Sequence, residues 1–85
     1  MKVEFTDSSR KQIKKIDEYN RNRILKYLFE VENLEDPRSR GKALKQNLKG
    51  LWRYRVGDYR IVCDNEDEEV TILVVKIGHR RDINK

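Results

Sequence analysis

The clearest pattern of apolar and polar residues runs over residues 51–63. In its first half, apolar and basic side chains alternate with a period of two, which predicts a β-strand with one apolar and one basic face. Gly57 and Asp58 then fit a two-residue turn with glycine at its first central position. Closing this turn predicts a β-hairpin with five cross-strand pairs: Val56–Tyr59, Arg55–Arg60, Tyr54–Ile61, Arg53–Val62 and Trp52–Cys63.

The N-terminal half of the chain shows helical spacing after a short strand at residues 2–5. Polar residues at 6–9 offer N-cap candidates for a first helix that carries Ile13 and Ile16 on one face. The pattern weakens around residues 19–20, where we expect a break. A second helix is predicted from about residue 22 to 32, and its apolar stripe consists of Ile24, Leu25, Leu28 and Phe29.

The C-terminal half continues the sheet. Residues 70–77 are almost all β-branched or apolar, which predicts a central strand buried on both faces. The acidic residues 64–69 connect it to the hairpin. The order β-α-α-β-β-β predicts a small α+β fold, an antiparallel sheet with a helical hairpin packed on one face. We expect residues 1–85 to form a single domain.

Charge adds a candidate partner. The chain carries a net charge of +5, and residues 38–63 hold eight basic residues but one acidic residue. A local basic stripe favours a nucleic acid partner, and the alternative is a solvated surface. The single cysteine, Cys63, excludes an internal disulfide and is expected in the core. No signal peptide or membrane-spanning segment is recognisable, so we expect a cytoplasmic protein without a membrane partner.

Arginine is the candidate for chemistry. Arg53, Arg55 and Arg60 share the basic face of the predicted hairpin, and Arg80 follows the next strand. Guanidinium groups match phosphate oxygens bidentately, so such a cluster is typical of a phosphodiester site. Arg55 faces Arg60 directly, and like charges at that spacing weaken a sheet unless an anion lies between them. The alternative is a solvated sheet face.

Other residues are weaker candidates. Lys45 and Lys49 could extend a phosphate track before the hairpin. His79 is the only histidine and could act as a general acid or base, although a surface or phosphate-contacting role is the more common one. Aromatic stacking on bases is the less favoured role for Trp52 and Tyr54, because the core packs on their predicted side.

The run L-W-R-Y-R-V-G-D-Y-R at residues 51–60, with G-H-R at 78–80, resembles the RelE branch of the RelE/ParE toxin superfamily over essentially the whole chain. The resemblance implies a type II toxin–antitoxin toxin that cleaves mRNA in the ribosomal A site. The ribose 2′-hydroxyl attacks the adjacent phosphate without a metal or other cofactor. The implied partners are the ribosome, mRNA and a RelB-like or Phd-like antitoxin that forms a hetero-oligomer with the toxin.

Carried over by position, the resemblance implies catalytic roles for four arginines. Arg53 and Arg55 match the paired basic residues of the family, and Arg55 would act as the base or orient the 2′-hydroxyl. Arg60 would stabilise the phosphate, and Arg80 the leaving oxygen. The expected substrate-binding residues are Lys45, Lys49, His79, Arg81 and Asn84.

Asn84 departs from the family, which often carries a tyrosine there to stack on or orient the substrate base. The departure leaves open a weakened natural enzyme or an inactivating substitution. Two other functions also remain open. One is a ParE-like toxin that inhibits DNA gyrase without nuclease activity, and the other is an RNA-binding or ribosome-binding protein without catalysis.

Overall fold

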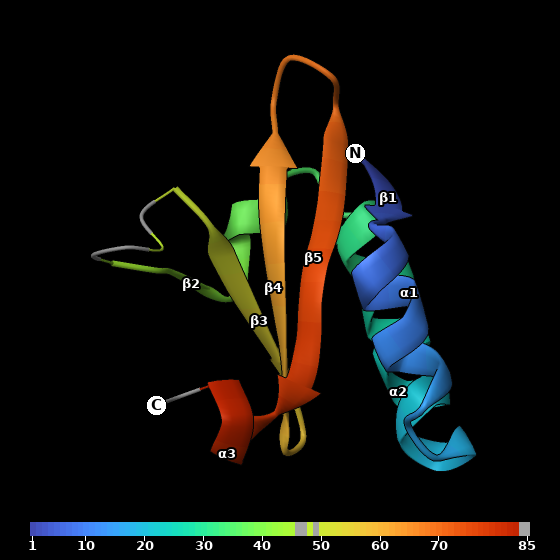
Figure 1. The fold of residues 1–85 in the computed structure, drawn as a ribbon. Coiled ribbons are helices and arrows are strands. Elements are labelled where there is room, and N and C mark those ends of the chain that lie inside the picture. The colour runs from blue at the N-terminus through green and yellow to red at the C-terminus, as the bar shows by residue number, and fades with distance from the viewer. Residues whose placement is uncertain (46–47, 49, 84–85) are drawn as a thin grey trace.

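The computed structural model describes residues 1–45, 48 and 50–83, and its centre is a five-stranded sheet with the order β1-β5-β4-β3-β2 (Figure 1). The strands are β1 (Lys2–Phe5), β2 (Lys42–Ala43), β3 (Trp52–Val56), β4 (Tyr59–Glu66) and β5 (Thr71–His79). The helices are α1 (Asp7–Lys14), α2 (Glu18–Glu32) and α3 (Arg80–Ile83), with a 3₁₀ turn, η1, at Pro37–Ser39. The predicted α+β class is confirmed.

The sheet is mixed, because β1 runs parallel to β5 while the other neighbours are antiparallel. The prediction of a wholly antiparallel sheet was therefore wrong for this pair. A tight turn forces antiparallel pairing, but β1 is separated from β5 by the helices and the hairpin. The long connection leaves the direction of β1 free.

The two long helices cover different parts of the sheet. α2 contributes Ile24, Leu28 and Val31 to the core. α1 lies along β5 where β1 has ended: the Ser9 hydroxyl donates to the carbonyl of Val74 at 2.7 Å, and the backbone N–H of Ile77 donates to Gln12 Oε1 at 2.8 Å (Figure 1). Side chains of α1 thus satisfy backbone groups that a strand would otherwise pair.

The helical break lies earlier than predicted. α2 begins at Glu18, because the Asp17 carboxylate caps it by accepting from the backbone N–H of Asn20 at 3.0 Å. The Asn20 side-chain amide also donates to this carboxylate, at 2.9 Å, and the two hydrogen bonds lower the pKa of Asp17. The buried apolar stripe of α2 is narrower than predicted, since Leu25 and Phe29 are exposed.

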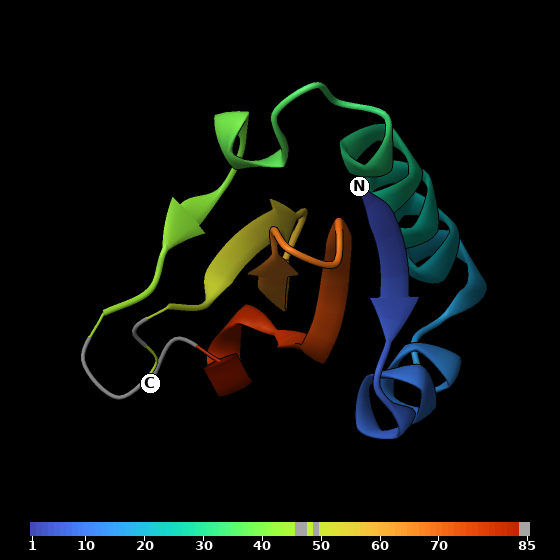
Figure 2. The same ribbon diagram turned by 90° about the horizontal axis from the view of Figure 1, so that it is seen from above.

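β5 is buried less evenly than predicted. The register shifts between Val62 and Cys63 of β4: Val62 pairs with Lys76 and Cys63 with Val74, which leaves Val75 as the extra residue of a β-bulge in β5. Val74 and Ile77 therefore both face the core, while Lys76 is exposed. Figures 1 and 2 place α3 at the end of β5, on the side of the sheet away from α2.

Candidate functional site

The hairpin of β3 and β4 has the predicted register. All five predicted cross-strand pairs are present, including Arg55 opposite Arg60. Gly57 adopts a positive φ of 57°, as the first central position of this turn requires. Tyr54 and Ile61 face the core and are fully buried, so Arg53, Arg55 and Arg60 lie on the opposite face.

Arg60 is the buried member of this group, with 6% of its surface exposed. Its guanidinium donates to the backbone carbonyls of Gly57 and Tyr59 at 3.5 and 3.3 Å, which are long hydrogen bonds. No carboxylate forms an ion pair with Arg60 within the described part of the chain. A poorly compensated cation therefore lies at the surface of the sheet.

Strand pairing places Arg53 and Arg55 on the same face as Arg60, and a hydrogen bond to Asp58 brings Arg80 to the turn of the same hairpin. Burial is the main cause that lowers the pKa of Arg60. The next causes are the positive charges of Arg55, Arg53 and Arg80, while Asp58 acts in the other direction. We call these four arginines the arginine cluster. Like charges in one place provide a strong site for an anion.

Asp58 positions the fourth arginine. The backbone N–H of Arg80 donates to the carbonyl of Asp58 at 2.7 Å, and the Nε atom of Arg80 lies 3.9 Å from the Asp58 carboxylate. The turn of the hairpin thus holds the start of α3 near the end of β3 and the start of β4. The sequence did not indicate this role, because the contact joins the hairpin turn to the start of α3, which is distant in the chain.

His79 lies on the other face of the sheet. It is paired with Tyr59, whose side chain points away from the arginine cluster, and the two rings meet edge to face with centroids 5.7 Å apart. The backbone N–H of Arg81 donates to His79 Nδ1 at 3.3 Å. The structure therefore does not bring His79 together with the arginines. Counting alternation along β5 from Val74 would have given the opposite answer, because the extra residue Val75 changes the phase.

The remaining predicted residues lie at the periphery. Lys45 is exposed in the segment after β2, and Arg81 is exposed in α3. Lys49 and Asn84 fall outside the described residues. Two lysines that the sequence did not single out, Lys42 and Lys76, are exposed on the same face as Arg53. Only the register of β2 and the bulge in β5 show their positions.

The open face of β4 is divided by charge. Arg60 occupies one end, whereas Asp64 and Glu66 occupy the other. Burial raises the pKa of Glu66, and the nearby charges of Glu69, Asp64 and Glu4 raise it further. A polyanion is therefore repelled from one end of this face and attracted to the arginine cluster at the other.

Other kinds of site find less support among the described residues. No three His, Cys, Asp or Glu side chains come together there as metal ligands. Cys63 is fully buried, and burial raises the pKa of its thiol to about 12. This agrees with its predicted place in the core. No helix in the described part is both long and apolar enough to cross a membrane.

Comparison with known proteins identifies the family. Residues 3–84 match the family model described as "ParE toxin of type II toxin-antitoxin system, parDE", so the chain belongs to this family of the RelE/ParE superfamily. The chain is 28% identical to toxin RelG of Mycobacterium tuberculosis over 81 residues, which cover 95% of the chain and 92% of RelG. It is thus a toxin of a type II toxin–antitoxin system.

Solved structures agree with this assignment. The toxin–antitoxin complex RelBE2 of Mycobacterium tuberculosis contains a chain with a TM-score of 0.84 and 28% identity, covering 93% of this protein and 96% of that chain. A free E. coli RelE mutant gives a TM-score of 0.79 at 25% identity, covering 98% and 86%. The fold described above is therefore the fold of RelE toxins.

Proposed function

We propose that this toxin is a ribosome-dependent endoribonuclease that cleaves mRNA in the ribosomal A site. Residues 1–85 act as a single RelE-like toxin domain in this proposal. The observation that supports it most is Arg60, a buried cation surrounded by three further arginines and without a carboxylate partner in the described residues. A phosphodiester supplies the negative charge that such a cluster lacks.

The proposed reaction is an internal transfer at phosphorus. The ribose 2′-oxygen loses its proton and forms a bond to the adjacent phosphorus, while the bond from phosphorus to the 5′-oxygen breaks. The 5′-oxygen takes up a proton, so the products are a 2′,3′-cyclic phosphate and a 5′-hydroxyl. Negative charge increases on the phosphoryl oxygens in the transition state, which favours stabilisation by fixed cations.

Each arginine of the cluster has a separate proposed role in the reaction, which follows from its position. Arg60, held between the two neighbouring strands, stabilises the phosphoryl oxygens. Arg55 lies opposite Arg60 and orients the 2′-hydroxyl, and Arg53 continues the same face. Arg80, held by Asp58, supports the leaving oxygen. Guanidinium groups keep their protons in proteins, so catalysis rests on positioning and charge stabilisation rather than on a strong base.

The residues outside the cluster bind the substrate in this proposal. Lys45 and Lys49 contact RNA before the hairpin, and Arg81 and Asn84 contact it beyond β5. His79 contacts RNA only from the end of β5, since its ring packs against Tyr59 on the other face. Its proposed role is therefore binding rather than proton transfer.

A cognate antitoxin of the RelB-like or Phd-like type is the proposed protein partner. Similar chains occur in toxin–antitoxin complexes, among them RelBE2. An antitoxin that places acidic side chains over the arginine cluster would neutralise the charge that the substrate needs. The complex would then be a hetero-oligomer without nuclease activity.

Primer extension on a translated message tests the proposed nuclease. Purified toxin is added to ribosomes paused on a defined codon, and new 5′ ends are mapped. We expect cleavage within the A-site codon for the wild type and a loss of about 10²–10³ in rate for Arg60→Ala. Lys11→Gln, which removes an exposed charge on α1, is the matched control. Intact message with the wild type, and also with Asn84→Tyr, would overturn the proposal.

The second candidate is inhibition of DNA gyrase, and the ParE description of the matching family model favours it. The arginine cluster favours the nuclease. A supercoiling assay separates the two, since gyrase inhibition without any new mRNA ends would reverse this order.

A further inference from the structure

Lys42 and Lys76 are the two ends of one row across the sheet, and this row passes through Arg53 of the arginine cluster. Lys42 of β2 pairs with Arg53 of β3, Arg53 pairs with Val62 of β4, and Val62 pairs with Lys76 of β5. Residues that pair directly across a sheet point to the same face. Both lysines are exposed, whereas Val62 between them is 4% exposed. The row therefore begins and ends in an exposed positive charge.

We propose that Lys42 and Lys76 bind message phosphates on the two sides of the scissile one, so that the RNA strand crosses the sheet from β2 to β5. The inference rests on the proposed nuclease function and adds the path of its substrate. Among the described residues, neither lysine forms an ion pair or a side-chain hydrogen bond. Their charges are available to a ligand.

The spacing of the row suits a nucleic acid strand. Neighbouring strands lie about 4.8 Å apart, so three steps from β2 to β5 span about 14 Å between backbones. In a stacked nucleic acid strand, successive phosphates lie about 3.4 Å apart along the axis, and in an extended nucleic acid strand they lie further apart. The row therefore covers several consecutive nucleotides. Lysine binds phosphate as a flexible point charge, which is suited to phosphates that do not react.

β2 has only two residues, but contacts on its N-terminal side fix the backbone at Lys42. The indole Nε1–H of Trp52 donates to the carbonyl of Arg40 at 2.7 Å. Gly41 has a φ of +80°, and a Cβ atom there would lie 2.5 Å from the carbonyl oxygen of Arg53. Only glycine permits this approach, which brings the next residue, Lys42, beside Arg53.

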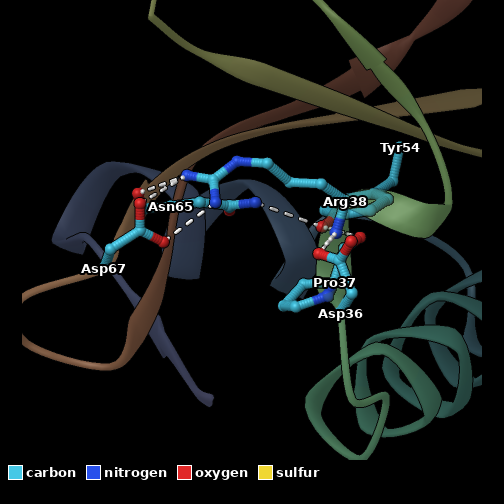
Figure 3. A network of polar contacts seen from close by, with 6 residues as sticks. All are labelled: Asp36, Pro37, Arg38, Tyr54, Asn65 and Asp67. Atoms are coloured by element: carbon cyan, nitrogen blue, oxygen red, sulfur yellow. Dashed lines mark hydrogen bonds and ion pairs between the residues drawn. The ribbon is translucent and has the colours of Figure 1, made fainter.

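A second set of contacts holds the start of the same segment (Figure 3). The Tyr54 hydroxyl donates to the carbonyl of Pro37 at 2.9 Å, and the Asn65 amide donates to that hydroxyl at 3.4 Å. Arg38 forms an ion pair with Asp67 at 2.9 Å and donates to the carbonyl of Asn65. The segment that carries Lys42 is thus fixed at Pro37 and Arg38, the first two residues of η1.

The bulge in β5 gives Lys76 its orientation. Val74 and Ile77 are both buried although they are three residues apart, an odd spacing that regular alternation would not allow. The extra residue, Val75, changes the phase, so Lys76 points away from the core between two buried positions. Bulges often redirect a side chain next to a functional site.

The experiment measures how toxin binding depends on the message in the A site. Ribosomes carry a message with 2′-O-methyl groups in the A-site codon, which blocks cleavage, or a message that ends in the P site. We expect wild-type toxin to bind more tightly when the codon is present. Lys42→Gln and Lys76→Gln should each lose several-fold of that difference and lower the salt exponent by about 0.7. Lys11→Gln on α1 is the matched control.

The possible results test the role of the two lysines separately from the nuclease proposal. Variants that bind like Lys11→Gln overturn the role of the two lysines, and so does wild-type binding that ignores the A-site codon. Equal weakening on both kinds of ribosome also overturns it, because the lysines would then contact ribosomal RNA. If the codon-dependent binding is lost in both variants but the wild type never cleaves unmodified message, the inference stands and the nuclease proposal fails.

Discussion

The two faces of the β3–β4 hairpin differ although alternate residues of the same two strands form them. On one face Tyr54, Ile61 and Cys63 are fully buried against α2 and the rest of the core. On the other face, which points away from the core and α2, Arg53, Arg55 and Arg60 gather. The first face stabilises the fold through burial of apolar surface. The second face concentrates like charges, which opposes folding.

The comparison indicates that stability and anion binding are separated by the alternation of a single hairpin. A change at an even position of β3 alters the core, and a change at the next position alters the cluster. Substitutions on the two faces should therefore affect different measurements.

The largest expected effect is on the core face. Ile61→Ala removes buried methyl and methylene groups at a position with no exposure, and should lower the free energy of unfolding by about 2–5 kcal/mol. Urea unfolding followed by circular dichroism measures this. A loss below 0.5 kcal/mol would show that this face is not the tightly packed one.

The next effect concerns activity rather than stability. Arg55→Ala should lower the rate of message cleavage by about 10²–10³, since it removes a cation next to the reacting phosphate. Because Arg55 is exposed, the free energy of unfolding should change by less than about 0.5 kcal/mol. Cleavage on paused ribosomes and urea unfolding are measured on the same preparation. A stability loss as large as that of Ile61→Ala would remove the distinction between the faces.

The core face should also respond to pH. Burial raises the pKa of Cys63 from 9.0 to about 12, so the folded state keeps a neutral thiol that the unfolded chain ionises. The thiol's contribution to stability is complete below pH 9 and is lost as the pH rises. Between pH 8 and 10 the loss is about 1.4 kcal/mol.

Cys63→Ala provides the control for this pH dependence. The difference in unfolding free energy between the wild type and this variant should shrink by about that amount from pH 8 to pH 10, because the variant lacks the thiol that ionises in the unfolded chain. A difference that stays constant would mean that the thiol is accessible to water in the folded state.

The smallest effect lies far from both faces of the hairpin. Val70, in the turn before β5, has a φ of 53° and is 58% exposed, so a β-branched residue occupies a strained conformation without packing to compensate. Val70→Asn should raise the free energy of unfolding by about 0.5–1 kcal/mol and leave cleavage unchanged. Destabilisation in urea would show that the Val70 side chain is needed there.

The hairpin could be predicted from sequence because its signals are local. Alternation and the turn at Gly57 determine the register, and the register alone places Arg55 opposite Arg60. The parallel pairing of β1 with β5 has no such signal, because it joins the two ends of the chain. The bulge at Val75 is likewise invisible in a run of β-branched residues, so the exposed position of Lys76 was missed.

The segment before the hairpin shows the same limit. No hydrophobic period in residues 37–50 predicts a helix or a strand, yet η1 and β2 form there. They depend on donors from distant residues, the Trp52 indole and the Tyr54 hydroxyl, whose partners are backbone carbonyls. Backbone carbonyls occur at every position, so the sequence does not show which ones are used.

The free energy of unfolding of Arg60→Met at low ionic strength tests the central claim most directly. Methionine keeps an unbranched stem but removes the charge that is buried among Arg53, Arg55 and Arg80. We predict a variant that is more stable than the wild type by about 1 kcal/mol and that no longer cleaves message. A variant that is less stable than the wild type would contradict the account. The charge of Arg60 would then stabilise the fold, whereas the account holds that it destabilises the free protein and serves to bind phosphate.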